Sequence, residues 1–242
     1  GCGMTAFFDY PKSAAFGRVV PKNKIYEHAG ANTALKDLFV REVDQIVWRF
    51  KLAPETINLS ARGSVPEIQV FTVSLKTGKL DEAILRAIDK AIPYPLIFEL
   101  TWRGKRKAMA AFKRPSEADS TKWVISEYFT TDWVPEDAAR TPLPVALNLG
   151  ALYERMLTAL MPAEPHASRQ DSEDIQTRVE RLEAIRAKVR EVERIKARLA
   201  REKQYNKRVA INAELRTANQ ELAELKSTDA VRANALSAAT NK

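Results

Sequence analysis

The sequence has little of the chemistry that metal sites and disulfides need. Its 242 residues include one cysteine, Cys2, and two histidines, His28 and His166. Cys2 lies in Gly1–Gly3, which precedes Met4 and reads as a cloning scar. Without a native cysteine there is no disulfide framework and no thiolate metal site, and two isolated histidines argue against zinc. We therefore expect no metal, no cofactor and a reducing cytoplasmic environment.

Glycine-rich motifs and long hydrophobic runs are missing as well. The eight glycines form no P-loop, no dinucleotide-binding fingerprint and no Gly-x-Ser-x-Gly nucleophile elbow. No run approaches the ~20 apolar residues of a membrane span, and the N-terminus lacks a signal-peptide pattern. These absences exclude enzymes built on those motifs and predict a cytoplasmic protein that does not contact a membrane.

Positive charge exceeds negative charge. The chain has 39 Lys and Arg against 31 Asp and Glu, a net charge of +8. Such a balance favours an anionic partner, such as nucleic acid or a membrane surface. Many basic proteins bind no such partner, so an incidental positive charge remains the alternative.

The last quarter of the chain has the strongest pattern. From about Asp171 to Lys226 there is no Gly or Pro, and apolar residues recur at helical spacing among dense charges, which predicts a helical coiled-coil arm. The first apolar seam ends at Leu199 and the second begins at Ile211, a separation that is not a whole number of heptads. Either the coil shifts phase there or the helix breaks and folds back. The seam residues expected to mediate assembly are Leu182, Ile185, Val189, Val192, Leu199, Ile211, Leu215 and Leu222.

The arm follows a globular domain. We expect a scar over residues 1–3, an α+β domain over 4–161, a proline-containing linker over 162–170, the arm over 171–226 and a flexible tail over 227–242. The domain is predicted to be a small mixed sheet with packed helices.

Several elements of this domain can be placed from pattern alone. Asn32 or Thr33 is expected to cap a helix that runs to about Leu52 along one apolar stripe. The β-branched run Ile68–Leu75 predicts a strand, and Asp81 then caps a helix that ends before Pro93. The remaining predicted elements are a strand over 96–102, a hairpin with 106–113, a strand over 122–131 and a helix over 148–161.

The hairpin turn gathers cations beside an aromatic residue. The stretch Trp102–Lys107 holds four cations, and two more follow at the end of the second strand. Such a tip can contact phosphates and stack on a base. The alternative is a solvated tip whose charges discourage edge aggregation. The candidate nucleic-acid-binding residues are Trp102, Arg103, Lys105, Arg106, Lys107, Lys113 and Arg114.

Catalysis has only weak candidates. Glu67 at the head of one central strand and Glu99 on the next could hold magnesium in a nuclease. A restriction-type core places an acidic residue and a lysine two apart on one strand, and Glu99-Leu100-Thr101 lacks that lysine. The favoured interpretation is that Glu67 caps a strand end, while Glu99 faces solvent or pairs with a basic neighbour.

Five segments together resemble an uncharacterised bacterial family, domain of unknown function 4391, over nearly the whole chain from residue 4 to 225. They are Phe8–Lys12, Pro21–Tyr26, Trp48–Leu59, Ile92–Glu99 and Lys203–Val209. The resemblance implies a companion of helicases and DNA methyltransferases in bacterial antiviral defence or restriction-modification regions. It carries over no active site.

Three interpretations of function result. The leading one is a non-enzymatic accessory or adaptor subunit of an anti-phage or restriction-like system, whose domain binds nucleic acid or a helicase or methyltransferase while the arm contacts a protein partner. The second is a metal-dependent nuclease that uses Glu67 and Glu99. The third is a structural dimer in which the arm self-associates as a coiled coil and the positive charge is incidental.

Overall fold

The computed structural model describes residues 5–162 and 173–240, and the chain forms two compact units, Gly1–Pro162 and Ala163–Lys242. Cys2, His166 and almost all of the predicted linker lie outside the described residues. No helix in the described part is long and apolar enough to cross a membrane.

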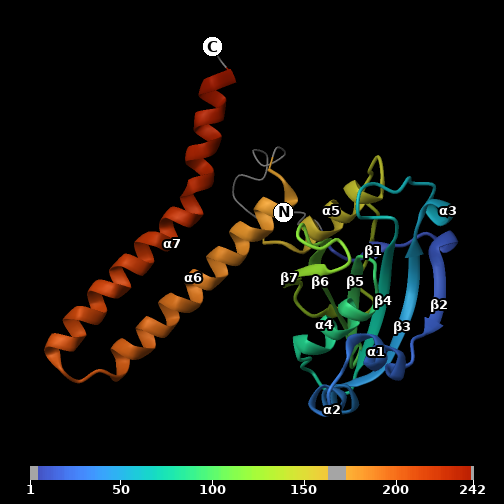
Figure 1. The fold of residues 1–242 in the computed structure, drawn as a ribbon, viewed down its shortest axis with the longest axis horizontal. Coiled ribbons are helices and arrows are strands. Elements are labelled where there is room, and N and C mark those ends of the chain that lie inside the picture. Colours follow the sequence, from blue (N-terminus) through green and yellow to red (C-terminus); the bar gives the residue numbers. More distant parts are fainter. Residues whose placement is uncertain (1–4, 163–172, 241–242) are drawn as a thin grey trace. The chain divides into compact units, whose positions relative to one another are not determined.

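The first unit is built on a mixed sheet (Figure 1), as the predicted α+β class requires. Its order is β2-β3-β4-β5-β6-β7, and the short β8 also pairs with β6. Only β4 and β5 run parallel; every other pair of neighbours is antiparallel. The strands are β2 (Ala15–Val19), β3 (Val43–Leu52), β4 (Ile68–Leu75), β5 (Leu96–Trp102), β6 (Lys105–Pro115), β7 (Trp123–Thr130) and β8 (Val134–Pro135).

The parallel pair confirms the predicted strand-helix-strand unit. Helix α4 (Glu82–Ala91) crosses from β4 to β5, and the Asp81 side chain caps it by accepting a hydrogen bond from the amide of Ala83. Because β4 and β5 are parallel, their C-terminal ends lie at the same end of the sheet. The β5–β6 turn is at this end.

Helices cover one face of the sheet. Here α1 (Lys22–Ala29), α2 (Thr33–Glu42) and α4 contribute apolar side chains to a core with strands β3 to β7. The centre of this core is fully buried. Its most deeply buried members include Ile25, Phe39, Ile46, Phe71, Ile84, Leu85, Ile88 and Phe98.

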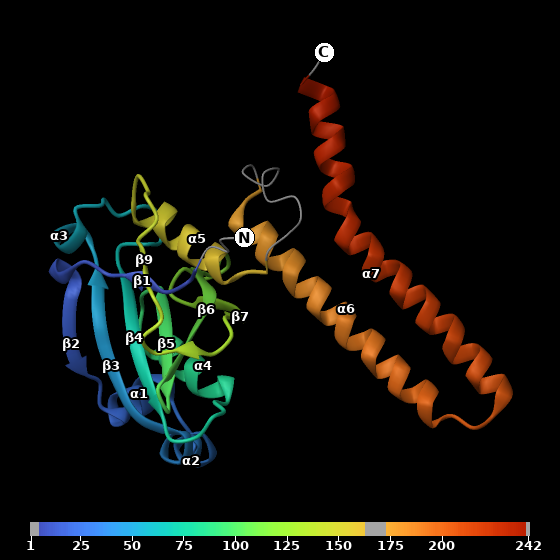
Figure 2. The same cartoon turned by 180° about the vertical axis from the view of Figure 1, so that it is seen from behind.

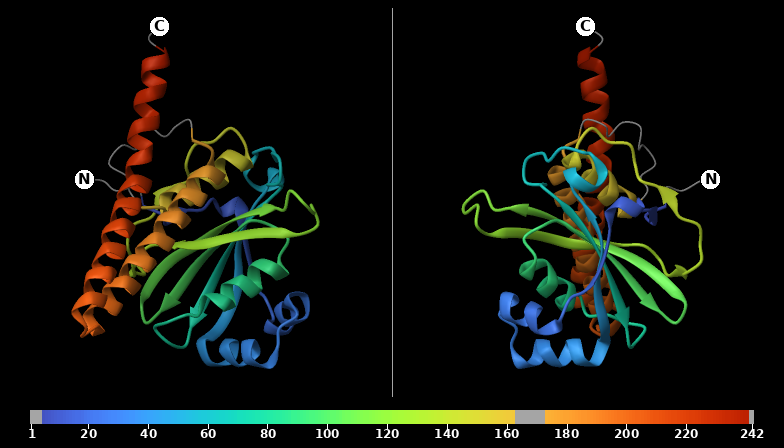
Figure 3. Two further views of the ribbon diagram at one scale, coloured as in Figure 1. Left: turned by 60° about the vertical axis from the view of Figure 1, so that its left-hand side comes forward. Right: turned by 90° about the vertical axis from the view of Figure 1, so that its right-hand side faces the viewer.

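The opposite face is covered by the helix α5 (Leu149–Leu160), which packs on β6 and β7, and elsewhere by irregular segments. Strand β1 (Phe8–Asp9) pairs in parallel with β9 (Thr141–Pro142), and both lie across the sheet from α1 and α4 (Figures 1 and 2). The right-hand view of Figure 3 shows α4 on one side of the sheet and the yellow segment around residues 135–147 on the other. The short helices η1 (Lys12–Ala14) and α3 (Pro54–Ile57) complete the unit.

The predicted helix from residue 33 to 52 is wrong in its second half. Asn32 does cap α2, since its side chain accepts from the amide of Leu35 at 2.9 Å. The helix ends at Glu42, however, and Val43–Leu52 is the strand β3. The segment is rich in β-branched and aromatic residues, which suit a strand between two neighbours. The apolar stripe at helical spacing did not show where the helix ends and the strand begins.

The second unit is a pair of helices rather than one long helix. Helix α6 (Ile175–Arg201) and helix α7 (Tyr205–Thr240) are antiparallel neighbours, and the chain turns back between them. Arg208 donates to the carbonyls of Leu199 at 3.1 Å and Glu202 at 2.9 Å, which satisfies the open end of α6. Of the two alternatives for this arm, the helix that breaks and folds back is therefore the one present.

The predicted apolar seam is formed between α6 and α7 of the same chain. Val192 and Ile211 belong to a buried cluster with Ile195 and Ala218, and Leu199, Leu215 and Leu222 pack against it. An ion pair between Arg198 and Glu214, 2.9 Å long, joins the two helices across the seam. The other predicted assembly residues differ in exposure: Leu182 is buried, Ile185 is half-buried and Val189 is 39% exposed.

Helix α7 also runs further than the predicted arm. It continues to Thr240, through most of the segment that was expected to be a flexible tail from residue 227. This stretch contains several alanines and neither glycine nor proline, so its helix propensity is high.

A buried lysine joins α4 to the sheet. The Lys113 ammonium group, on β6, is completely buried and donates to the carbonyls of Asp89, Ile92 and Tyr94 at the end of α4. It also pairs with the Asp89 carboxylate at 3.4 Å, and the Tyr128 hydroxyl donates to the same carboxylate. Burial raises the pKa of Asp89 to about 6 and lowers the pKa of Lys113 to about 8, while the attraction between the two groups opposes both changes.

We expect Lys113→Met to lower the free energy of unfolding by about 3 kcal/mol, because it leaves a buried carboxylate and several carbonyls without their donor. Loss of the cation raises the folded-state pKa of Asp89 further, whereas the unfolded chain releases this proton near its ordinary pKa. The free energy of unfolding of the variant should therefore fall as pH rises from 5 to 7, more steeply than that of the wild type.

Urea unfolding at both pH values tests this, with the exposed Lys122→Met as the matched control. Equal unfolding midpoints for the two variants would contradict the assigned role of Lys113.

Candidate functional site

The predicted hairpin is present and its turn is tight. Trp102 pairs with Lys105, so Arg103 and Gly104 alone connect β5 to β6. Both have positive φ, 46° for Arg103 and 70° for Gly104. This backbone matches the twist of antiparallel strands and holds the turn in one conformation.

Cations surround the tip of this hairpin. Arg103 and Lys105 are exposed and Lys107 is half-buried. The Arg103 guanidinium lies 5.1 Å from the centre of the Trp102 ring, and the Lys107 ammonium lies 5.6 Å from that of Trp133. We call Arg103, Lys105 and Lys107 the tip cations.

Trp102 itself is committed to packing. It is half-buried against the helix-covered core, and a Cβ built on Gly78 would lie 2.9 Å from its ring. With one side on the protein and the Arg103 guanidinium also over it, the ring supports the tip. It is less suited to stacking on a base than the sequence alone indicated.

The other predicted nucleic-acid-binding residues lie elsewhere. Arg106 is 4% exposed and donates to the carbonyls of Glu136 and Ala138. Lys113 is 1% exposed and serves α4 as described above. Arg114 is half-buried at the far end of β6. Because side chains alternate along a strand, Arg106 points to the opposite face from its two lysine neighbours.

The two candidate catalytic acids are not brought together. Glu99 pairs in register with Thr72, and Glu67 precedes Thr72 by five residues, which separates the backbones by roughly 16 Å at about 3.3 Å per residue. Glu67 lies 3.6 Å from the Lys51 ammonium and accepts from the Gln69 amide. In the described part of the chain, no three His, Cys, Asp or Glu side chains gather as a metal site.

Glu99 has a partner from far along the chain. Arg140 donates to both its carboxylate oxygens, at 2.7 and 3.3 Å, and to the carbonyl of Phe8 at 3.0 Å. The Glu99 side chain is only 7% exposed. A charge this buried needs a partner, and a paired arginine supplies one. The interpretation in which Glu99 pairs with a basic residue is therefore confirmed.

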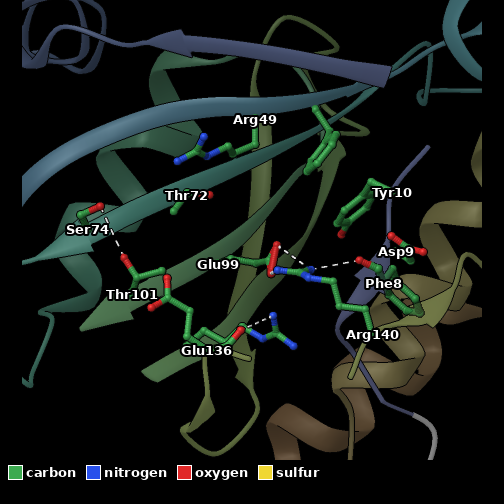
Figure 4. A pocket seen from close by; sticks show the side chains of 12 residues that line it. Phe8, Asp9, Tyr10, Arg49, Thr72, Ser74, Glu99, Thr101, Glu136 and Arg140 are labelled. Carbon is green, nitrogen blue, oxygen red and sulfur yellow. Dashed lines mark hydrogen bonds and ion pairs between the residues drawn. The ribbon is translucent and has the colours of Figure 1, made fainter. Parts of the chain in front are cut away.

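A polar pocket lies on the face of the sheet opposite α1, α2 and α4. Its volume is about 400 Å³, and it is bounded by strands β3 to β6, by the segment Phe8–Tyr10 and by Glu136 and Arg140. Figure 4 shows Arg49, Thr72, Ser74 and Thr101 toward one end, Phe8, Asp9 and Tyr10 at the other, and the Glu99–Arg140 pair between them. We call this the sheet-face pocket.

Tyr10 closes the aromatic end of the pocket. Its ring stacks on Phe50 with centroids 4.7 Å apart, and Phe8 meets it edge-on. Burial raises the pKa of Tyr10 well above its ordinary value, the nearby Glu99 carboxylate adds to this rise, and Arg140 opposes it. The phenol therefore stays protonated and can donate a hydrogen bond.

Sequence reasoning missed the pocket. Its polar residues come from β3, β4, β5 and a loop some forty residues further on, so no local motif links them. One signal was present: Glu99 stands between the apolar residues Phe98 and Leu100 on a strand, and a charge in such a position needs a partner. Nothing in the sequence identified that partner as Arg140.

A family model for a domain of unknown function, DUF4391, matches residues 8–222. The chain belongs to this family. The match includes the sheet, the sheet-face pocket, α6 and the paired part of α7, so both units are part of what the family shares. No curated protein and no solved structure matches the chain.

We expect Arg140→Ala to lower the free energy of unfolding by about 3 kcal/mol, because it leaves the buried Glu99 carboxylate without a cation. Arg140→Lys should recover only part of this loss, since an ammonium group cannot make the two parallel contacts. The double variant Glu99→Leu with Arg140→Leu should cost less than the sum of the single changes.

Urea unfolding of these variants measures the coupling. Additive effects of the single Leu changes would mean that the contact contributes nothing to stability.

Proposed function

We propose that this protein is a non-enzymatic accessory subunit that binds nucleic acid through its β5–β6 hairpin, within a bacterial anti-phage or restriction-like system. The observation that carries the proposal is the cluster of tip cations, of which Arg103 lies in the tight turn and Lys105 and Lys107 lie at the start of β6. Cations fixed in advance lose little freedom on binding, so they favour contact with phosphates. The net charge of +8 acts in the same direction.

The hairpin would contact the sugar-phosphate backbone of the nucleic acid rather than its bases. Trp102 and Trp133 are half-buried, and each already has a cation over its ring. Neither offers a free face of the kind that single-strand binding proteins use for stacking. We therefore expect affinity that depends strongly on salt and weakly on sequence.

The helical unit would serve a protein partner, for which a helicase or a DNA methyltransferase is our candidate. Its own two helices cover its apolar seam, so a partner would contact the outer surface. The first residues of α7 expose apolar groups there: Tyr205 is 78% and Val209 51% exposed. Self-association through the same surface is the competing proposal.

The test is to replace Arg103, Lys105 and Lys107 together by Ala. We expect the affinity for a labelled DNA duplex to fall on the order of tenfold or more at 0.1 M salt, because three phosphate contacts are lost. The slope of log K against log salt should become shallower by about 2 to 3. Fluorescence anisotropy over a range of salt concentrations measures both quantities.

A matched control removes the same charge elsewhere. Lys12, Lys24 and Lys90 are exposed on other elements, and their joint replacement by Ala should leave most of the affinity and the salt slope intact. If both triple variants lose the same affinity, binding reflects net charge and the hairpin is not the contact. If wild type binds no DNA at low salt, the proposed function fails.

A further inference from the structure

The sheet-face pocket is unassigned by anything above. Its volume of about 400 Å³ lies within the range of small-molecule sites, about 300–1,000 Å³. It lies on four neighbouring strands, which position side chains more precisely than loops do. Its lining is mostly polar, although it sits on one face of a sheet.

Arg49 is the one guanidinium of the pocket without an internal acceptor among the described residues. It is exposed on β3, and no hydrogen bond or ion pair ties it to the described part of the chain. Figure 4 shows it at the same end as Thr72, Ser74 and Thr101. A free guanidinium beside hydroxyl donors is the arrangement that binds a phosphate group.

The hydroxyl groups are available for the same purpose. The three side chains are half-buried, and the contact between the Thr101 and Ser74 hydroxyls is long, at 3.4 Å. Within the described residues, the Thr72 hydroxyl has no hydrogen-bond partner. Hydroxyls on adjacent strands can rotate toward an anion that enters above them.

The other two arginines shape the pocket and leave this role to Arg49. Arg140 is occupied by Glu99 and by the carbonyl of Phe8. Arg106 holds the loop at Glu136 and Ala138, and its Nε is buried without an acceptor. The Arg106 Nε is therefore a donor without a partner beside the pocket, and buried donors of this kind are rare in folded proteins.

The far end of the pocket suits hydrogen-bond donors on a ligand. The exposed Asp9 carboxylate forms no ion pair with the described residues. The rings of Tyr10 and Phe50 form an apolar wall beside it. An anionic ligand would avoid this end, whereas hydroxyl or amino groups could donate to Asp9.

We propose that the sheet-face pocket binds a small phosphate monoester, with its phosphate on Arg49 and the neighbouring hydroxyls and its uncharged polar end on Asp9. A sugar phosphate and a nucleoside monophosphate share this chemistry. The site is distinct from the tip cations and does not depend on DNA binding.

Isothermal titration calorimetry of the full chain tests the site against ribose 5-phosphate, the four common nucleoside 5′-monophosphates, inorganic phosphate, ribose and the four corresponding nucleosides. At least one monoester should bind with a Kd on the order of 10–100 µM. Its counterpart without phosphate should bind about tenfold more weakly or worse. Which monoester binds best distinguishes a sugar phosphate from a nucleotide.

Two variants locate the binding. Arg49→Gln should weaken the monoester about tenfold or more, and Thr72→Val should weaken it less. Arg18→Gln is the matched control, because Arg18 is exposed on the adjacent strand β2 and does not line the pocket. Circular dichroism should give all three variants the wild-type fold.

Three outcomes overturn the proposal. They are the absence of heat from every monoester at about 5 mM, an undiminished affinity in Arg49→Gln, and inorganic phosphate binding as tightly as the monoesters. The last would indicate an anion site without the assigned polar end. The DNA titration tests other residues. A negative result in calorimetry therefore does not affect the hairpin proposal, and a negative result with DNA does not affect the pocket proposal.

Discussion

The contact between Arg140 and Glu99 joins the irregular segments to the face of the sheet opposite α1, α2 and α4. It connects a long irregular segment to a central strand, and the same guanidinium binds the carbonyl of Phe8 in the N-terminal segment. The ladder between β1 and β9 is only two residues long, too short to hold these segments by itself. The hollow on this face is lined mostly by polar side chains, with this charge pair between its two ends.

Local pattern predicted much of the α+β unit. The strand Ile68–Leu75, the helix capped by Asp81 and the β5–β6 hairpin all carry their own boundary signals, and each is confirmed. Residues 43–52 carry none that separates them from the preceding helix. Their state is set by pairing with β2 and β4 on either side, a constraint that spacing along the chain does not contain.

At the candidate site, the sequence likewise did not show which single residues are exposed and which are buried. Lys105, Arg106 and Lys107 look alike as a basic run, but alternation along β6 gives them different surroundings, and Arg106 becomes an internal support. Lys113 likewise stabilises the end of α4. Composition could indicate a basic surface. It could not divide the cations between surface and interior, because that division depends on which face of the sheet each segment covers.

The positive φ of Arg103 lowers the stability of the turn at a position that carries a positive charge. A non-glycine residue in the left-handed region costs on the order of 1 kcal/mol, and asparagine is the residue that two-residue hairpins favour there. A hairpin selected for stability alone would therefore carry Asn-Gly. Arginine in this place makes the turn less stable than asparagine would and puts an exposed cation at the tip of the hairpin, so the chain gives up stability here for charge.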